Sequence, residues 1–140
     1  MAEGYGIHTS AKGDKYEGEW HLFKKHGTGT ETFANQDVYT GMYKEGCPHG
    51  MGQYRWTNGS MYIGSFVMGL KQGKGKWKKD VNDMNSNEYQ GEYYQDRKHG
   101  FGIFKWASGN VYQGSYKNDE RDGIGEMKWT DGSIYQGEWM

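Results

Sequence analysis

Three histidines occupy equivalent positions in the sequence, each immediately before a Gly-x-Gly triplet, and a row of histidines could bind metal ions: His26, His49 and His99. Two ligands of one zinc ion lie about 3 to 4 Å apart. Equivalent atoms in successive two-stranded units of a β-sheet are instead about 10 Å apart. We therefore interpret these histidines as turn residues with local contacts, and we expect no metal site.

The other candidates for catalysis lack the partners that they would need. Cys47 lies close to His49, but no third group recurs near the pair to orient a Cys/His nucleophile. No Gly-x-Gly continues into Gly-x-Gly-x-x-Gly or Gly-Lys-Ser/Thr, so these glycines do not form a phosphate-binding loop. Four glutamates fall on the polar side of a period-two pattern, as solvated strands require: Glu17, Glu19, Glu92 and Glu138. We predict neither an enzyme nor a bound cofactor.

Residues 71–80 contain the one concentrated basic segment. Its lysines surround Trp77 and are Lys71, Lys74, Lys76, Lys78 and Lys79. Alternation along a strand puts Lys74, Lys76 and Lys78 on one face. Asp80 reduces the net charge of residues 71–80 to +4. At about 1 kcal/mol per net charge near an anionic membrane, the segment supplies roughly 4 kcal/mol, which corresponds to about millimolar affinity. The segment is therefore either a solvated face or a contact for anionic lipid or an acidic partner.

Composition limits the fold that carries these residues. The 140-residue chain has only 16 Leu, Ile, Val and Phe residues in total, too few for an ordinary aliphatic core, but 16% of its residues are aromatic. Its 24 glycines disfavour long helices, since each glycine inside a helix costs roughly 1 kcal/mol. Its 17 basic and 18 acidic residues give no sign of nucleic-acid binding. With a single cysteine and no apolar leader, the sequence predicts a cytoplasmic protein.

One repeated unit runs through the sequence. A Tyr-x-Gly motif recurs at intervals of 23, 23, 27, 23 and 23 residues, beginning at Tyr16, Tyr39, Tyr62, Tyr89, Tyr112 and Tyr135. A Gly-x-Gly triplet follows every motif except the last. We divide the chain into a half repeat (1–15), five repeats that start at the first five tyrosines, and a second half repeat (135–140). The longer interval places extra residues in 79–88, which we expect to protrude as a mobile loop.

Each unit is predicted to be a β-hairpin. Residues alternate with period two on both sides of short turn-like segments such as 44–50 and 117–123. One face of the hairpin carries aromatic rings and glycines, and the other face is polar. Rings can cover bare glycine backbone on a neighbouring strand, so they replace the missing aliphatic core. The sequence predicts an all-β fold, an elongated single-layer antiparallel meander in which each repeat contacts only its neighbours.

The unit resembles the MORN (membrane occupation and recognition nexus) repeat family, whose consensus is approximately Y-x-G-x-W-x-x-G-x-x-H-G-x-G. Residues 39–52, YTGMYKEGCPHGMG, are close to this consensus, as are YEGEW at 16–20 and HGTG at 26–29. Apart from the longer interval, the sequence departs from the family at Gln72 and Asp122, which replace the usual histidine. Family members include junctophilins, plant phosphatidylinositol phosphate kinases, radial-spoke-head proteins and protist cytoskeletal scaffolds. The resemblance implies a hairpin meander within a cilium, flagellar axoneme or cytoskeleton.

A single-layer sheet leaves its aromatic face uncovered, and large exposed aromatic surfaces usually mark binding sites. We therefore expect a non-enzymatic protein-interaction scaffold that receives an extended or helical segment of a protein partner. The rings predicted to form this site are Tyr16, Trp20, Tyr39, Tyr43, Trp56, Tyr62, Tyr89, Trp106, Tyr112 and Trp129. Several of these rings must pack between strands instead. The alternative function is a membrane tether that binds anionic phospholipids through the lysines of 71–79.

The outermost strands of such an array each have one unpaired edge, and open edges are templates for further pairing. The sequence starts with the second half of a unit, Gly4 to Ser10, and stops with the first half of another, Tyr135 to Met140. We expect another molecule to cap these edges, either a second copy of the chain or a different protein. Head-to-tail self-association would propagate as a filament.

Overall fold

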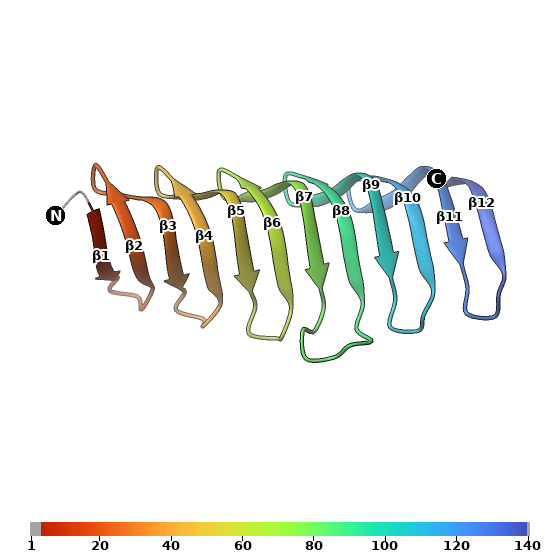
Figure 1. Cartoon of the computed structure of the whole chain (residues 1–140), viewed down its shortest axis with the longest axis horizontal. Helices are drawn as coiled ribbons and strands as arrows, with labels where there is room; N and C mark the ends of the chain where they lie inside the picture. The colour runs from red at the N-terminus through yellow and green to blue at the C-terminus, as the bar shows by residue number, and fades with distance from the viewer. Residues whose placement is uncertain (1–3, 140) are drawn as a thin grey trace.

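The computed structural model describes residues 4–139, which form one twelve-stranded antiparallel sheet whose strand order equals the order in the chain. The ribbon in Figure 1 is elongated and one sheet thick. This confirms the predicted all-β single-layer meander. The strands are β1 (Gly4–Thr9), β2 (Lys15–His21), β3 (Lys24–Thr32), β4 (Val38–Lys44), β5 (Cys47–Arg55), β6 (Met61–Val67), β7 (Leu70–Lys78), β8 (Glu88–Tyr94), β9 (Arg97–Lys105), β10 (Val111–Lys117), β11 (Glu120–Lys128) and β12 (Ile134–Trp139). Positions 1–3 of the half repeat 1–15, and position 140 of the half repeat 135–140, lie outside the described residues.

The turn inside each hairpin is shorter than the sequence analysis predicted. Segment 44–50 was expected to be a turn, but β4 ends at Lys44 and β5 begins at Cys47, which leaves only Glu45 and Gly46 between them. Both residues have positive φ, 50° and 86°. Positive φ at both central positions is the type I′ geometry, whose twist matches that of the flanking strands, so pairing continues up to the turn.

A row of glycines crosses the whole sheet, one glycine in each strand, because every strand pairs glycine against glycine. The row consists of Gly6, Gly18, Gly29, Gly41, Gly52, Gly64, Gly75, Gly91, Gly102, Gly114, Gly125 and Gly137. The tyrosine of each Tyr-x-Gly motif lies across this row. A Cβ added to Gly52 would be only 2.6 Å from Cζ of Tyr39, so the tyrosine needs a bare backbone beneath it.

The first residue of each Tyr-x-Gly motif must be tyrosine, because its hydroxyl also donates a hydrogen bond. The register of each hairpin shifts just after the motif, for example between Gly41 and Tyr43. Oη of Tyr39 donates a hydrogen bond of 2.7 Å to the carbonyl of Met42, which lies inside this irregularity. The other five motif tyrosines make the equivalent bond at 2.7–2.9 Å. A phenylalanine would cover the glycines but leave this carbonyl without its partner.

The rings above the glycines form one continuous edge-to-face row, which is the core of the protein. Neighbouring ring centroids are 5.0–5.5 Å apart, and their planes meet at 80–90°. This geometry is the favoured one for aromatic pairs. In spatial order the row contains Trp20, Tyr16, Tyr43, Tyr39, Phe66, Tyr62, Tyr93, Tyr89, Tyr116, Tyr112, Trp139 and Tyr135.

The opposite face is not uniformly polar, so that part of the prediction was wrong. Met51, Phe101 and Ile124 occupy the middle position of their Gly-x-Gly triplets and point away from the tyrosines, as does Ile63. Each of the four keeps 43–65% of its surface exposed. Alternation identified which residues share this face, but it did not require all of them to be polar.

Segment 79–88 extends beyond the other turns at the same edge, below β7 and β8 in Figure 1. It is closed by a hydrogen bond of 2.9 Å from the Lys79 amide to the Asn87 carbonyl. The Val81 amide also donates to the carbonyl of Gly59, which lies in the preceding turn. The protrusion therefore agrees with the sequence analysis, and the mobility of the loop stays a prediction.

Candidate functional site: the aromatic face

The ten rings predicted to bind a partner divide into two groups. The tyrosines have at most 3% of their surface exposed and pack between strands: Tyr16, Tyr39, Tyr43, Tyr62, Tyr89 and Tyr112. The tryptophans keep accessible surface, up to 40% for Trp129: Trp20, Trp56, Trp106 and Trp129. Only the tryptophans can offer their rings to a partner, whereas the buried tyrosines hold the sheet together.

Four cations share one repeat position on the aromatic face, and this group was not predicted from the sequence. The residue nine positions after the motif tyrosine pairs with an aromatic residue of the preceding strand, so its side chain joins the aromatic face. This position is Lys25, Pro48, Lys71, Lys98 and Arg121 in the five repeats. The signal was visible in the sequence as a basic residue at one repeat position in four repeats out of five. Only Lys71 had been singled out, as part of the basic segment.

Three of these cations lie over several rings each. Lys71 Nζ is 5.7, 5.7 and 5.4 Å from the ring centroids of Trp56, Tyr62 and Tyr93. The Arg121 guanidinium is 4.7 Å from Trp139, and it also lies over Trp106 and Tyr112. Such contacts stabilise a cation through the negative face of the ring, but a ring does not replace the hydrogen-bond acceptors of water.

Lys98 has similar surroundings and is half-buried. Its ammonium lies over the rings of Tyr89, Phe104 and Tyr116 at 5.5–5.8 Å. Burial lowers the pKa of Lys98, and the Asp119 carboxylate, 3.9 Å away, partly opposes that shift. The neighbouring cation Lys71 also contributes to lowering the Lys98 pKa, so successive cations of the row interact.

The first repeat carries two buried carboxylates on this face, Glu31 and Asp37. Glu31 accepts hydrogen bonds from Lys25 Nζ and Tyr43 Oη, each at 2.9 Å. Burial and the negative charge of Glu31 raise the pKa of Tyr43. Asp37 is likewise buried and accepts from Tyr54 Oη and from the Thr57 amide, both at 3.0 Å. Burial and the bond to Asp37 raise the pKa of Tyr54 to about 12.

Hollows open on both faces. On the aromatic face, a hollow of about 460 Å³ between β9 and β12 is lined by Phe104, Trp106 and Trp139 together with Lys98 and Arg121. On the opposite face, a hollow of about 610 Å³ has the glycine row as its floor and Met51, Ile63 and Phe101 among its walls. The first hollow combines rings and cations, and the second combines apolar side chains with Lys74 and Lys76.

The basic segment 71–79 is divided between the two faces. Lys74, Lys76 and Lys78 do share the face opposite the tyrosines, as alternation predicted, whereas Lys71 lies among the rings. Lys76 forms an ion pair with Glu88 at 3.6 Å, and Lys74 is the cross-strand partner of Glu92. The structure therefore does not bring the five lysines into one patch, and lipid binding stays a prediction.

The histidines do not converge. Across residues 4–139, no group of three or more His, Cys, Asp or Glu side chains is placed to hold a metal ion. His26, His49 and His99 lie within β3, β5 and β9, so their assignment to turns was wrong, because pairing runs almost to the end of each hairpin. His49 accepts a hydrogen bond of 3.2 Å from the Met68 amide. Among the same residues, no helix is long and apolar enough to span a membrane.

The outer strands pair on one side only within the described residues, β1 with β2 and β12 with β11. The edge predicted to be capped is therefore present at each end of the sheet. Capping by a second copy or by another protein stays a prediction.

These features define a class: a β-hairpin repeat ribbon with a ring-lined, cation-bearing open face. The family model for the MORN repeat matches residues 16–38, 39–61, 62–83, 89–111 and 112–134. The chain belongs to the MORN-repeat family. The matched segments begin at the same five tyrosines that start the repeats in the sequence analysis.

Comparison with solved structures shows a similar fold elsewhere. The chain is similar to the TCP domain of SAS-4 (dCPAP) of Drosophila melanogaster, which is described in complex with a proline-rich motif of Ana2 (dSTIL). The two share 13% sequence identity, the match covers 94% of this chain and 77% of that chain, and the TM-score is 0.50. A catalytically inactive virginiamycin B lyase of Staphylococcus aureus with quinupristin matches with 9% identity, 98% and 70% coverage, and a TM-score of only 0.24. No curated protein sequence matches the chain.

Proposed function

We propose that this chain is a protein-interaction scaffold that holds an extended segment of a partner protein against its aromatic face. The observation that carries the proposal is a ring-lined face that no second layer covers within residues 4–139. Trp106 borders a hollow on this face, and Trp129 is among the exposed rings. Aromatic-lined grooves of this kind bind extended peptides, and proline-rich ones in particular.

The similarity to the TCP domain supports the proposal at the level of the fold. That domain is described with a proline-rich motif of another protein. Proline-rich segments adopt the extended polyproline II conformation, which pays little entropy on binding. A single-layer ribbon with exposed tryptophans suits a partner of this kind better than a small-molecule substrate, because its hollows are open rather than enclosed.

Site-specific photo-crosslinking tests the proposal. A photoreactive amino acid is placed at position 106, on the aromatic face, or at position 113, which is exposed on the opposite face. The variants are exposed to extracts, and crosslinked partners are identified by peptide sequencing. We expect partner peptides to be captured from position 106 and not from position 113. Equal capture from both positions would refute the aromatic face as the binding surface.

The cellular setting is a separate part of the proposal. We place the scaffold in a ciliary or flagellar axoneme or in the cytoskeleton, on the strength of the family resemblance. Imaging of a tagged chain in ciliated cells tests this placement. A chain that is spread evenly through the cytoplasm would contradict it.

The alternative function, a membrane tether, has weaker support because the lysines of 71–79 face in two directions and pair with acidic neighbours. Sedimentation with vesicles that contain anionic phosphoinositides tests it. Binding that disappears when Lys74, Lys76 and Lys78 are changed to Glu would favour the tether over the scaffold.

A further inference from the structure

The cations of the aromatic face differ in whether an acceptor is provided for them. Lys25 already donates to Glu31 at 2.9 Å, and Lys98 has the Asp119 carboxylate 3.9 Å away. Among residues 4–139, no carboxylate forms an ion pair with Lys71 or Arg121, and neither side chain donates a hydrogen bond. The nearby Trp139 Nε1 is buried and also lacks an acceptor. These cationic donors are half-buried against rings, which offer them no hydrogen-bond acceptor. Anionic oxygens of a ligand would satisfy them.

The spacing of these cations restricts the shape of the ligand. Lys71, Lys98 and Arg121 occupy one repeat position on β7, β9 and β11, so adjacent members are two strands apart. Two strand spacings amount to about 9.6 Å. A polyproline II helix advances about 9.3 Å in its three-residue turn, so every third side chain would meet an equivalent cation.

Other conformations do not match this spacing. An extended β-strand presents side chains to the same face about every 6.7 Å. One turn of an α-helix advances about 5.4 Å, and two turns advance about 10.8 Å, so a helix drifts out of register by more than 1 Å in each repeat. Polyproline II is therefore the regular conformation whose repeat distance matches the spacing of the cations along the ribbon.

We propose that the aromatic face from β7 to β12 binds a polyproline II segment that carries an acidic side chain at every third residue. The inference rests on the proposed scaffold function and names its partner. The carboxylates accept hydrogen bonds from Lys71 and Arg121, and the one between them lies beside Lys98, which it shares with Asp119. The intervening prolines pack on accessible ring surface such as that of Trp106.

Spacing matters as well as charge in this site. Asp119 and Glu120 also line the hollow that contains Arg121. These carboxylates repel acidic side chains that do not reach a cation, so a continuous acidic run gains less than the same charges at three-residue intervals. The site should therefore distinguish two peptides of identical composition.

The test measures binding of synthetic peptides to the full chain by fluorescence anisotropy at low ionic strength. The first peptide contains four Glu-Pro-Pro triplets. The second replaces glutamate with glutamine, and the third has the composition of the first with its glutamates contiguous. We expect the first peptide to bind about tenfold more tightly than either of the others. Equal binding of the first and third peptides would overturn the spacing, and equal binding of the first and second would overturn acidic recognition.

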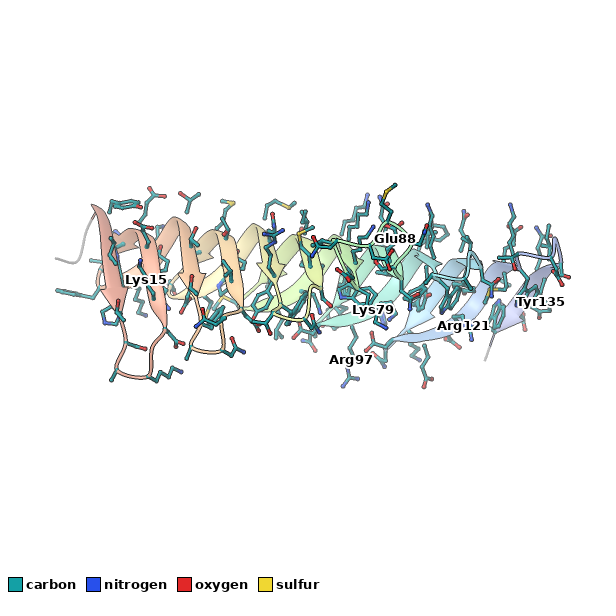
Figure 2. The ribbon with its side chains drawn as sticks, turned by 90° about the horizontal axis from the view of Figure 1, so that it is seen from below. Lys15, Lys79, Glu88, Arg97, Arg121 and Tyr135 are labelled. Carbon is teal, nitrogen blue, oxygen red and sulfur yellow. The ribbon has the colours of Figure 1, made fainter. Side chains whose placement is uncertain are left out.

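Variants of the chain locate the contact. We expect Arg121→Gln and Lys71→Gln each to weaken binding of the first peptide about tenfold. We expect Arg121→Lys to retain most of the affinity, which separates loss of charge from loss of structure. Arg97→Gln is the matched control, because Arg97 is exposed and reaches away from the ribbon (Figure 2). Unchanged binding in Arg121→Gln, with a native unfolding curve, would overturn the inference.

The outcome can be separated from that of the scaffold proposal. Failure of all three peptides, together with partner capture from position 106, overturns only the acidic polyproline ligand. Failure of the peptides together with equal capture from positions 106 and 113 overturns both. Anionic vesicles that bind through Arg121 while the first peptide does not would also overturn the inference, and would identify a lipid surface instead.

Discussion

The two ends of the aromatic face are built by one repeat but carry different chemistry. Near β3 and β4, the buried Glu31 and Asp37 accept hydrogen bonds from Lys25 and from two tyrosine hydroxyls. Toward β12, the positions equivalent to Glu31 are occupied by Trp77, Phe104 and Met127. Lys98 there has Asp119 at 3.9 Å, whereas Lys71 and Arg121 lie on rings and form no ion pair within residues 4–139. The first end satisfies its own polar groups, whereas the second leaves donors for a ligand.

This difference shows which parts of the repeat form the scaffold and which can vary. The glycine row and its tyrosines are identical at both ends, because the backbone geometry depends on them. The positions that pair across the tyrosine row, such as Glu31 and Met127, can change without altering the sheet. A ribbon of this kind can therefore specify a partner at a few variable positions.

The largest expected effect is alkaline unfolding, which tests whether the two ends remain one cooperative unit. Burial raises the pKa of Tyr16, Tyr39 and Tyr54 to about 12, and it raises the pKa of Tyr89 and Tyr116 as well. Tyrosines of the unfolded chain titrate near their ordinary value of about 10. The folded state therefore binds protons more tightly, and its stability is complete below about pH 10 and falls as the pH rises through 12.

Urea unfolding, followed by circular dichroism across this alkaline range, measures the effect. We expect a single transition whose midpoint is constant up to about pH 10 and then falls steeply. Two separate transitions would mean that the ends of the ribbon unfold independently. A midpoint that does not move at alkaline pH would contradict the burial of the tyrosine hydroxyls.

The second prediction concerns the glycine row, where the two ends should respond alike. Gly29→Ala and Gly125→Ala each put a Cβ 2.6 Å from a carbon of the overlying tyrosine ring. The ring cannot move away, because it is locked in the edge-to-face row. We expect each substitution to lower the free energy of unfolding by about 3 kcal/mol or more, measured by urea denaturation.

Gly46→Asn is the control for these substitutions. Gly46 has no atom within 4 Å of an added Cβ, and its φ of +86° is tolerated by asparagine. We expect the control to change the free energy of unfolding by less than about 0.5 kcal/mol. A loss at Gly29 but not at Gly125 would show that the scaffold itself differs between the two ends.

The repeat could be predicted from the sequence because spacing encodes it. Glycines at fixed distances from Tyr39 and its equivalents indicate the hairpins and the ring-and-glycine face without any long-range information. The turn at Glu45 and Gly46 was predicted too long, since only the backbone geometry reveals that pairing runs to the last possible residue.

The site was less predictable than the fold. Whether a ring such as Tyr43 packs or stays accessible depends on its neighbours in two adjacent strands, which alternation does not report. Lys98 and Arg121 each cover a ring of the next repeat, Tyr116 and Trp139, which lies far from the cation in the sequence. Comparison of one repeat position across all units would have found them, whereas a search for local clusters led to the lysines of 71–79.

The third prediction compares the loss of one tyrosine hydroxyl at each end of the aromatic face. Tyr43 donates to the buried Glu31, so Tyr43→Phe leaves a carboxylate oxygen unsatisfied. We expect this change to cost about 1–3 kcal/mol of unfolding free energy. Tyr116 occupies the equivalent position near the other end, and its hydroxyl has no hydrogen bond to residues 4–139. We expect Tyr116→Phe to cost less than about 0.5 kcal/mol.

Phe66 supports this expectation, since phenylalanine already occupies the equivalent position in the third repeat. Urea denaturation of both variants at neutral pH gives the comparison directly. Similar costs for the two substitutions would show that the hydrogen bond to Glu31 contributes nothing beyond the packing of the ring.

The smallest effect is expected at the turns, where the first and last hairpins form a matched pair. Leu22 and Asn118 open equivalent two-residue turns with φ of 49° and 50°. A left-handed conformation strains leucine by about 1 kcal/mol, whereas asparagine tolerates it. Leu22 is also 65% exposed, so little packing offsets its strain. We therefore expect Leu22→Asn to raise the free energy of unfolding by about 0.5–1 kcal/mol, and Asn118→Leu to lower it by a similar amount. Thermal unfolding of both variants measures the pair, and a destabilised Leu22→Asn would mean that the exposed leucine makes contacts worth more than the strain of its turn.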